Sequence, residues 1–218
     1  MHKRALLLWT GGKDSALAFY RAQAAGYEII RLVTFAPTAP HFRAHPIPVM
    51  KKQSACLGVP HEVIIVEEPL KDAYRTALAA CAQKYDIATI VTGDIALVNS
   101  QPNWIAECCA DMAVEILMPL WGEDRGQLME ALVAAGFHVV ISCARSKYFS
   151  ADWIGRRIDE ETLAELQTLH EQTGLDMCGE NGEYHTLVLD GPIFKYPVAL
   201  SSTGALPHDD LWCIALSR

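Results

Sequence analysis

Two glycines, a lysine, an aspartate and two hydroxyl residues share the six-residue segment TGGKDS at positions 10–15. The segment follows an apolar run over residues 5–9 and opens a pattern of helical spacing over residues 13–25. Strand, glycine turn and helix start in this order make an anion site, because the first N–H groups of a helix lack partners and its dipole favours negative charge. We therefore expect residues 10–15 to bind phosphate. The alternative is a glycine turn without a ligand.

The residue types of this segment suit the phosphate chain of a nucleotide. Lys13 supplies a positive charge, and the glycines let the backbone approach phosphate oxygens closely. Asp14 would be repelled by bare phosphate, so it predicts a bridging Mg²⁺, which prefers carboxylate and phosphate oxygens. The residues expected to bind the nucleotide here are Thr10, Gly11, Gly12, Lys13, Asp14 and Ser15, with Asp14 also the metal ligand.

Two commoner phosphate motifs are excluded. A Walker P-loop needs glycine in place of Leu7 and Ser or Thr in place of Asp14, and a dinucleotide fingerprint needs glycine in place of Lys13. The segment resembles the PP-loop, SGGxDS, of the ATP pyrophosphatases, with Thr10 in place of the usual serine. Those enzymes cleave ATP between the α and β phosphates and transfer AMP to an oxygen, from which a nucleophile displaces it. The resemblance implies that Lys13 neutralises the charge on the departing pyrophosphate.

Composition limits the classes of protein to consider. The chain has 218 residues, of which 51% are hydrophobic and 20% charged, and this is typical of a globular protein with a large core. A net charge of −8 argues against a broad nucleic-acid interface, although Arg43, Lys51 and Lys52 lie close together in the sequence. The apolar richness leads us to expect a homodimer.

The cysteines and the apolar runs indicate a compartment. Seven cysteines form no CxxC pair, so neither a zinc ribbon nor a redox dithiol is indicated, and we expect most of them to be buried. No apolar run approaches the roughly 18 residues of a membrane span, and we see no signal-peptide pattern. We therefore expect a cytoplasmic protein without a membrane partner.

Strand-like and helical patterns alternate along most of the chain. Alternation of this kind implies parallel βαβ units, and nearly all-apolar strands imply a sheet covered on both faces. The expected fold class is α/β, with a doubly wound, mostly parallel sheet. The expected strands are 5–9, 28–35, 62–66, 87–92 and 138–143, and the expected helices are 13–25, 47–57, 69–84, 103–113 and 125–135.

The pattern changes after about residue 144. A helix near 159–173 and a strand at 184–190 indicate a smaller C-terminal subdomain. We therefore expect an ATP-binding domain at 1–143 and a substrate subdomain at 144–218.

The second group of chemical residues lies in the stretch CGENGEYHTLVLDGPIFK at 178–195. Glu180 and Glu183 place two carboxylates three residues apart, and Tyr184 adds a hydrogen-bonding group. Such carboxylates can orient an amine, accept its proton or help to hold Mg²⁺, so we predict catalytic roles for these three residues. The alternative is a solvated hairpin loop.

This stretch resembles the GEGGEYET-LVLD-P-F signature of the diphthine–ammonia ligase family, a branch of the PP-loop ATP pyrophosphatases. Further matches follow in family order, with VTGDI at 91–95 and PLW at 119–121, so that the resemblance spans roughly residues 5–195. Two positions depart from the signature, because Asn181 replaces a glycine and His185 replaces a glutamate. The family's arginine after GDI is also missing, since no arginine occurs between Arg75 and Arg125.

The resemblance implies a PP-loop domain of the adenine nucleotide alpha hydrolase type with a smaller C-terminal domain. It implies an ATP- and Mg²⁺-dependent ligase that adenylates diphthine, a modified histidine of translation elongation factor 2. Ammonia then displaces AMP to give diphthamide. The implied partners are ATP, ammonia and a protein acceptor resembling elongation factor 2.

Four further residues are expected at the nucleotide. The resemblance suggests that backbone groups around Thr34, at the end of the second strand, read adenine. His45 is expected to face the nucleotide, since a metal site with His41 would lack a third ligand. Gly93 and Asp94 end the fourth strand, where Asp94 could bind ribose, metal or substrate, or cap the next element.

Two other functions remain open. One is RNA base modification, such as thiolation, by another PP-loop branch, which the acidic balance and the absence of CxxC pairs disfavour. The other is a sensor that binds ATP without turning it over, which the changes at Asn181 and His185 keep open.

Overall fold

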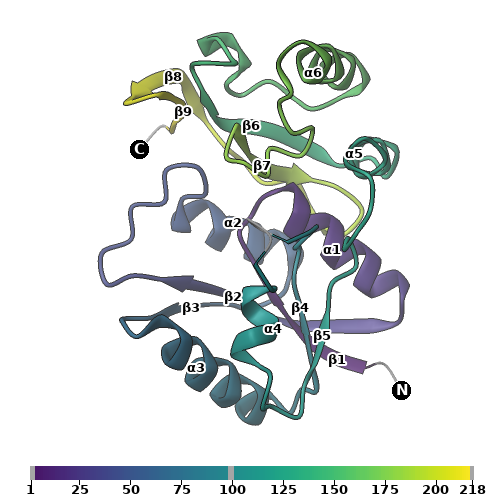
Figure 1. Cartoon of the computed structure of the whole chain (residues 1–218), viewed down its shortest axis with the longest axis vertical. Helices are drawn as coiled ribbons and strands as arrows, with labels where there is room; N and C mark the ends of the chain where they lie inside the picture. Colours follow the sequence, from purple (N-terminus) through teal and green to yellow (C-terminus); the bar gives the residue numbers. More distant parts are fainter. Residues whose placement is uncertain (1–2, 98–100, 217–218) are drawn as a thin grey trace. The chain divides into compact units, whose positions relative to one another are not determined.

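The computed structural model describes residues 3–97 and 101–216 (Figure 1). The chain divides into two compact units. The first comprises Met1–Thr10, Asp14–His41 and Gly58–Gly122, and the second comprises Gly11–Lys13, Phe42–Leu57 and Glu123–Arg218.

The first unit contains a five-stranded sheet in which every pair of neighbours is parallel, with strand order β3-β2-β1-β4-β5. Its strands are β1 (Lys3–Leu8), β2 (Tyr27–Ala36), β3 (His61–Ile65), β4 (Thr89–Val91) and β5 (Glu115–Leu117). The strand order reverses at β1, which lies between β2 and β4. Ligands of open parallel sheets bind beyond the carboxyl ends of the strands at such a point. The predicted α/β class with a mostly parallel sheet is confirmed.

Three helices lie mainly in the first unit. They are α1 (Lys13–Ala24), α3 (Leu70–Tyr85) and α4 (Trp104–Cys108). The first two begin and end within a residue of the prediction. The helix predicted at 103–113 is too long, because the N–H of Cys109 turns back to the carbonyls of Ile105 and Ala106 and ends the helix there. The chain then enters β5, a short strand that was not predicted because the helical pattern was extended close to its start.

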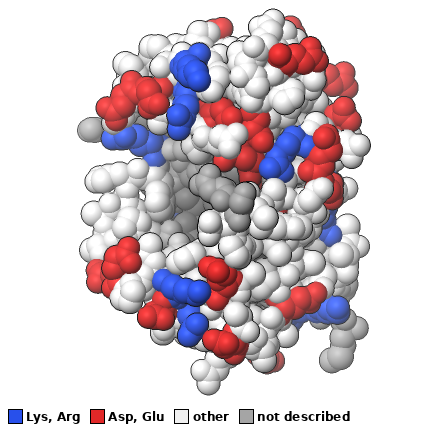
Figure 2. Space-filling view, viewed as in Figure 1, with Lys and Arg blue, Asp and Glu red and all other residues white. Residues whose placement is uncertain are grey.

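Charged side chains of both signs are interspersed on the face shown in Figure 2, and no continuous basic area is visible there. The chain carries 26 acidic and 18 basic residues.

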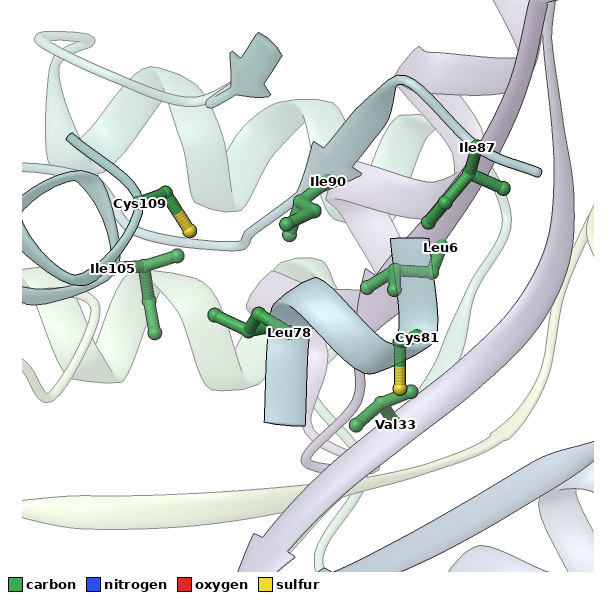
Figure 3. Packing of buried hydrophobic residues seen from close by; sticks show 8 residues of the cluster. All are labelled: Leu6, Val33, Leu78, Cys81, Ile87, Ile90, Ile105 and Cys109. Carbon is green, nitrogen blue, oxygen red and sulfur yellow. The ribbon is translucent and has the colours of Figure 1, made fainter. Parts of the chain in front are cut away.

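The core of the first unit lies between the strands and the helices α3 and α4 (Figure 3). Burial of one such aliphatic side chain favours folding by about 1.5–3 kcal/mol, so this cluster fixes the strands that carry the loops of the site. Its buried members are Leu6, Val33, Leu78, Cys81, Ile87, Ile90, Ile105 and Cys109.

The second unit contains a four-stranded sheet in the order β7-β6-β9-β8, and its paired strands are antiparallel. Its strands are β6 (His138–Arg145), β7 (Tyr184–Asp190), β8 (Ser202–His208) and β9 (Leu211–Leu216). The expectation that the strand at 138–143 continues the parallel sheet is wrong, because β6 pairs with β7 and β9 instead. A run of buried apolar residues predicts a strand, but it does not show whether that strand pairs parallel or antiparallel to its neighbours.

The remaining helices belong to the second unit, and they are α2 (Ile47–Leu57), α5 (Arg125–Ala134), the short 3-10 helix η1 (Ala151–Trp153) and α6 (Glu160–Thr173). Their ends follow local capping rules. Asp124 accepts a hydrogen bond from the N–H of Gln127 at 3.0 Å, as its spacing predicts, and Gly174 ends α6 in the left-handed region.

The seven cysteines are all free thiols, and six of them are buried. This confirms the prediction that most of them are buried. Among the described residues, none of the helices has both the length and the apolar character that a membrane crossing requires.

Candidate active site

The segment TGGKDS forms the strand–turn–helix connection that its sequence predicts, since β1 ends at Leu8 and α1 begins at Lys13. Gly11 has a φ of +80°, and a Cβ built on it would lie 2.4 Å from Oε1 of Gln53. Both its backbone conformation and the space around it therefore require glycine.

Gln53, on α2, holds this turn in place. Its side chain is fully buried, and its Nε2 donates hydrogen bonds of 2.8 Å to the carbonyls of Gly11 and Val188. The N–H of Val188 also donates to the Gly11 carbonyl, at 3.0 Å. The loop is therefore fixed by α2 and β7. Sequence reasoning missed Gln53, because a single glutamine in a helix carries no motif.

Replacing Gln53 by leucine is expected to lower the free energy of unfolding by about 1–3 kcal/mol, because a buried carbonyl loses its donor. Urea unfolding measures this change. Gln167→Leu, at an exposed position on α6, is the control and should change the stability by less than about 0.5 kcal/mol. Equal stabilities of the two variants would contradict the role of Gln53.

Lys13 is held between the loop and the start of β7. It is only 4% exposed, and its Nζ lies 5.8 Å from the ring centroid of Tyr184. Its backbone N–H, expected at a phosphate, donates instead to Oγ1 of Thr186 at 3.0 Å. The phenol of Tyr184 is buried and donates to the carbonyl of Met177 at 2.5 Å. Tyr184 therefore supports the lysine through its ring, while its hydroxyl holds a neighbouring loop.

His45 lies beside the second glycine of the loop. Its Nε2 would be 3.0 Å from a Cβ on Gly12, and its ring meets that of His185 edge to face, with 5.5 Å between centroids. Burial, followed by the positive charges of His185 and Lys13, lowers the pKa of His45 to about 3. His45 is therefore neutral at pH 7 in the absence of a ligand.

This lowered pKa predicts a loss of stability in mild acid. The unfolded chain protonates His45 near pH 6.5 and the folded chain only near pH 3, so the unfolded state binds more protons between these values. The stabilising contribution is complete above pH 6.5 and is lost as the pH falls toward 3. Between pH 7 and 5 the wild type should lose roughly 2 kcal/mol more stability than His45→Gln, as measured by urea unfolding. Equal losses would contradict the burial of His45, and His41→Gln is the control.

The remaining loop residues belong to the first unit. Oγ1 of Thr10 and Oγ of Ser15 are 3.2 Å apart, and Asp14 is half-buried in the first turn of α1. A Cβ on Gly93 would lie 2.8 Å from both the carbonyl carbon of Asp14 and the N of Ser15. The end of β4 therefore lies directly against the first turn of α1, and only glycine allows this approach.

The side chains of Asp94 and Thr34 form hydrogen bonds within the first unit. Oδ2 of Asp94 accepts 2.7 Å hydrogen bonds from Thr92 Oγ1 and from Nδ2 of Asn103, and Asn103 in turn caps α4. Oγ1 of Thr34 donates to the carbonyl of Trp9 and lies 2.8 Å from Nε2 of His61. Both side chains therefore fix the carboxyl edge of the sheet. The residues 98–100, in the stretch where the family pattern departs, lie outside the described residues.

The two predicted carboxylates of the C-terminal stretch have different surroundings. The carboxylate of Glu183 is buried and accepts hydrogen bonds from the N–H of Asp176 at 2.9 Å and of Asn181 at 3.0 Å. The side chain of Glu180 is exposed. Glu183 therefore organises the loop, whereas Glu180 is accessible to a ligand.

In the described ranges, no group of three or more His, Cys, Asp or Glu side chains is arranged to hold a metal ion. Mg²⁺ is usually bound by one or two carboxylates together with substrate phosphates and water. A half-buried carboxylate beside the loop that is expected to bind phosphate, such as that of Asp14, fits an ion of this kind.

Comparison with known proteins covers most of the chain. Residues 3–116 match the diphthamide synthase N-terminal domain, and residues 124–213 match the diphthamide synthase C-terminal domain. The chain is 25% identical to a diphthine–ammonia ligase of Danio rerio, over 95% of this chain and 90% of that protein. It is 24% identical to the one of Schizosaccharomyces pombe, over 94% of this chain and 37% of that protein.

A solved structure supports the fold. The predicted subunit of tRNA methyltransferase from Methanocaldococcus jannaschii superposes with a TM-score of 0.50 at 18% identity, covering 87% of this chain and 98% of that one. The two domain matches together with the ligase relatives confirm the resemblance carried by TGGKDS, VTGDI and GENGEYHTLVLD. The chain belongs to the diphthamide synthase family.

Proposed function

We propose that this chain is an ATP-dependent ligase that adenylates a carboxylate and passes the activated acyl group to ammonia. The observation that carries this proposal is the anchored PP-loop. The loop follows β1, where the strand order reverses, and Lys13 is fixed by Thr186 and Tyr184 of the C-terminal signature. The family match and the relatives named diphthine–ammonia ligase support the same chemistry.

In the first step, a carboxylate oxygen of the acceptor forms a bond to the α-phosphorus of ATP. The bond from this phosphorus to the bridging oxygen breaks, and the electron pair leaves with pyrophosphate. Lys13 stabilises the charge that develops on the pyrophosphate, which is the electrostatic contribution that dominates such transfers. Asp14 would hold Mg²⁺ against the phosphate oxygens, and that ion would supply further positive charge.

In the second step, ammonia attacks the acyl carbon, AMP departs and an amide forms. We assign the accessible carboxylate of Glu180 to orienting the amine and accepting its proton. Glu183 and Tyr184 act through position, because Glu183 organises the loop and Tyr184 supports Lys13. We place adenine at the backbone around Thr34 and Gly93, with Asp94 fixing this edge.

The two glutamates give separable predictions. Glu180→Gln should keep the thermal stability and the exchange of pyrophosphate into ATP, but lower amide formation about 100-fold, the usual scale of acid–base catalysis. Glu183→Gln should lower the melting temperature, because an amide NH₂ then faces the N–H groups that the carboxylate accepts. Unchanged amide formation by Glu180→Gln would refute its role.

The proposed activity is tested by its products. The purified chain is incubated with ATP, Mg²⁺, ammonium and candidate carboxylate acceptors, and the nucleotides are separated by chromatography. Acceptor-dependent AMP and pyrophosphate are the expected products, whereas ADP would refute the proposal. Tight ATP binding without pyrophosphate release under any of these conditions would identify a sensor.

The acceptor that we propose is a protein carboxylate of the diphthine type, as the names of the relatives indicate. A dimer of this chain and its cytoplasmic location stay predictions from the sequence.

A further inference from the structure

The side chain of His45 lies at the second glycine of the PP-loop, and the basic side chains of His185 and Lys13 are near that imidazole. His45 Nε2 lies 3.0 Å from the position of a Cβ on Gly12, and its ring is 5.5 Å from that of His185 at an angle of 79°. The positive charge of the Lys13 ammonium also lowers the pKa of the His45 imidazole. His185 lies on β7, and its positive charge acts on His45.

The electrostatics of this cluster favour an anion. Burial and the positive charges of His185 and Lys13 lower the pKa of His45, whereas a hydrogen bond to the backbone of Thr186 raises it. No carboxylate is among these causes. Proximity of the basic groups disfavours protonation of His45. A bound polyanion reverses this effect, because it compensates the positive charges and lets the imidazoles donate charge-assisted hydrogen bonds.

We propose that His185, together with His45, binds the pyrophosphate that leaves ATP at this loop, an inference that rests on the proposed function. When the bond between the α-phosphorus and the bridging oxygen breaks, the electron pair stays on the pyrophosphate. N–H groups of the two imidazoles donate hydrogen bonds to its oxygens beside the Lys13 ammonium. His185 is thus a further catalytic residue, and it has a different charge from the residue of the signature.

The residue at position 185 differs from the one in the family signature, and this difference changes the charge near the loop. The signature that the C-terminal stretch resembles has a glutamate where this chain has His185. A carboxylate at this place would repel pyrophosphate, whereas an imidazole attracts it. This chain should therefore bind the leaving group more tightly than a chain with glutamate at the same position.

The test uses the full chain and inorganic pyrophosphate with Mg²⁺, and titration calorimetry measures the dissociation constant. His185→Glu should raise this constant at least about tenfold, and His185→Asn by a smaller factor, since each hydrogen bond to a charged group accounts for about one order of magnitude. His138→Glu is the matched control. His138 pairs with Asp190 at the opposite end of β7, so the same new charge should leave pyrophosphate binding within about twofold.

The outcomes separate this inference from the proposed function. If the wild type forms AMP from ATP but His185→Glu, His185→Asn and His138→Glu all bind pyrophosphate as tightly as the wild type, the role of His185 is refuted and the ligase activity stands. If the wild type binds neither ATP nor pyrophosphate, both fail. Thermal melting reports whether each variant folds, and if His185→Glu does not, His185→Asn and His45→Asn decide the question by the same titration.

Discussion

Replacing Lys13 by methionine is expected to lower the rate of ATP-dependent AMP formation about 10²- to 10³-fold, the usual effect of removing one preorganised charge from a transition state. Lys13 is almost completely buried, its Nζ lies 5.8 Å from the Tyr184 ring centroid, and its backbone N–H is bonded to Thr186. Methionine keeps most of the length and packing of the side chain but removes its charge. The measurement is the initial rate of AMP formation at saturating ATP.

Lys51→Met is the control, because Lys51 is an exposed residue on α2. This variant should keep the wild-type rate, and both variants should melt near the wild-type temperature. A Lys13→Met enzyme that retains more than half of the wild-type rate would show that the charge of this lysine does not act on the reaction.

Replacing Gly93 by alanine is expected to weaken ATP binding at least about tenfold and to lower the free energy of unfolding by about 1–3 kcal/mol. The new methyl group would lie 2.8 Å from backbone atoms of Asp14 and Ser15. Backbone atoms cannot rotate away as a side chain can, so either the first turn of α1 or the end of β4 must shift. Because the first turn of α1 carries the proposed phosphate contacts and the end of β4 the proposed adenine contact, binding and stability should fall together.

Gly126→Ala is the matched control for this substitution. A Cβ on Gly126 meets only Oδ1 of Asp124, a side-chain atom 3.2 Å away. This variant should bind ATP normally, as measured by titration calorimetry. Normal ATP binding by Gly93→Ala would contradict the assignment of this edge to the nucleotide.

Local sequence signals predict most helices of this fold well. Helix α2 was predicted at 47–57 and spans Ile47–Leu57, since Pro46 precedes it and Gly58 follows with a φ of +71°. Pairing between distant strands is not encoded locally, and β6 was therefore assigned to the wrong sheet. Strand β8 was missed because Gly204 and Pro207 interrupt its pattern.

The candidate site shows the same division between local and distant signals. TGGKDS is recognisable because strand, turn and helix start follow one another within a few residues. Its partners come from far along the chain, since Gln53 and Thr186 lie 42 and 173 residues from the loop residues that they bind. No spacing rule connects positions so far apart. The burial of Glu183, which the sequence suggested as a reactive carboxylate, likewise follows only from the folded loop.

The most direct test of the account is a crystal structure of this chain with Mg²⁺ and an ATP analogue that has a methylene group between the α and β phosphorus atoms. We predict density for the β and γ phosphates at residues 10–15, with the Lys13 ammonium in contact with their oxygens. Nucleotide density elsewhere, with no phosphate at this loop, would contradict the assignment on which the proposed chemistry depends.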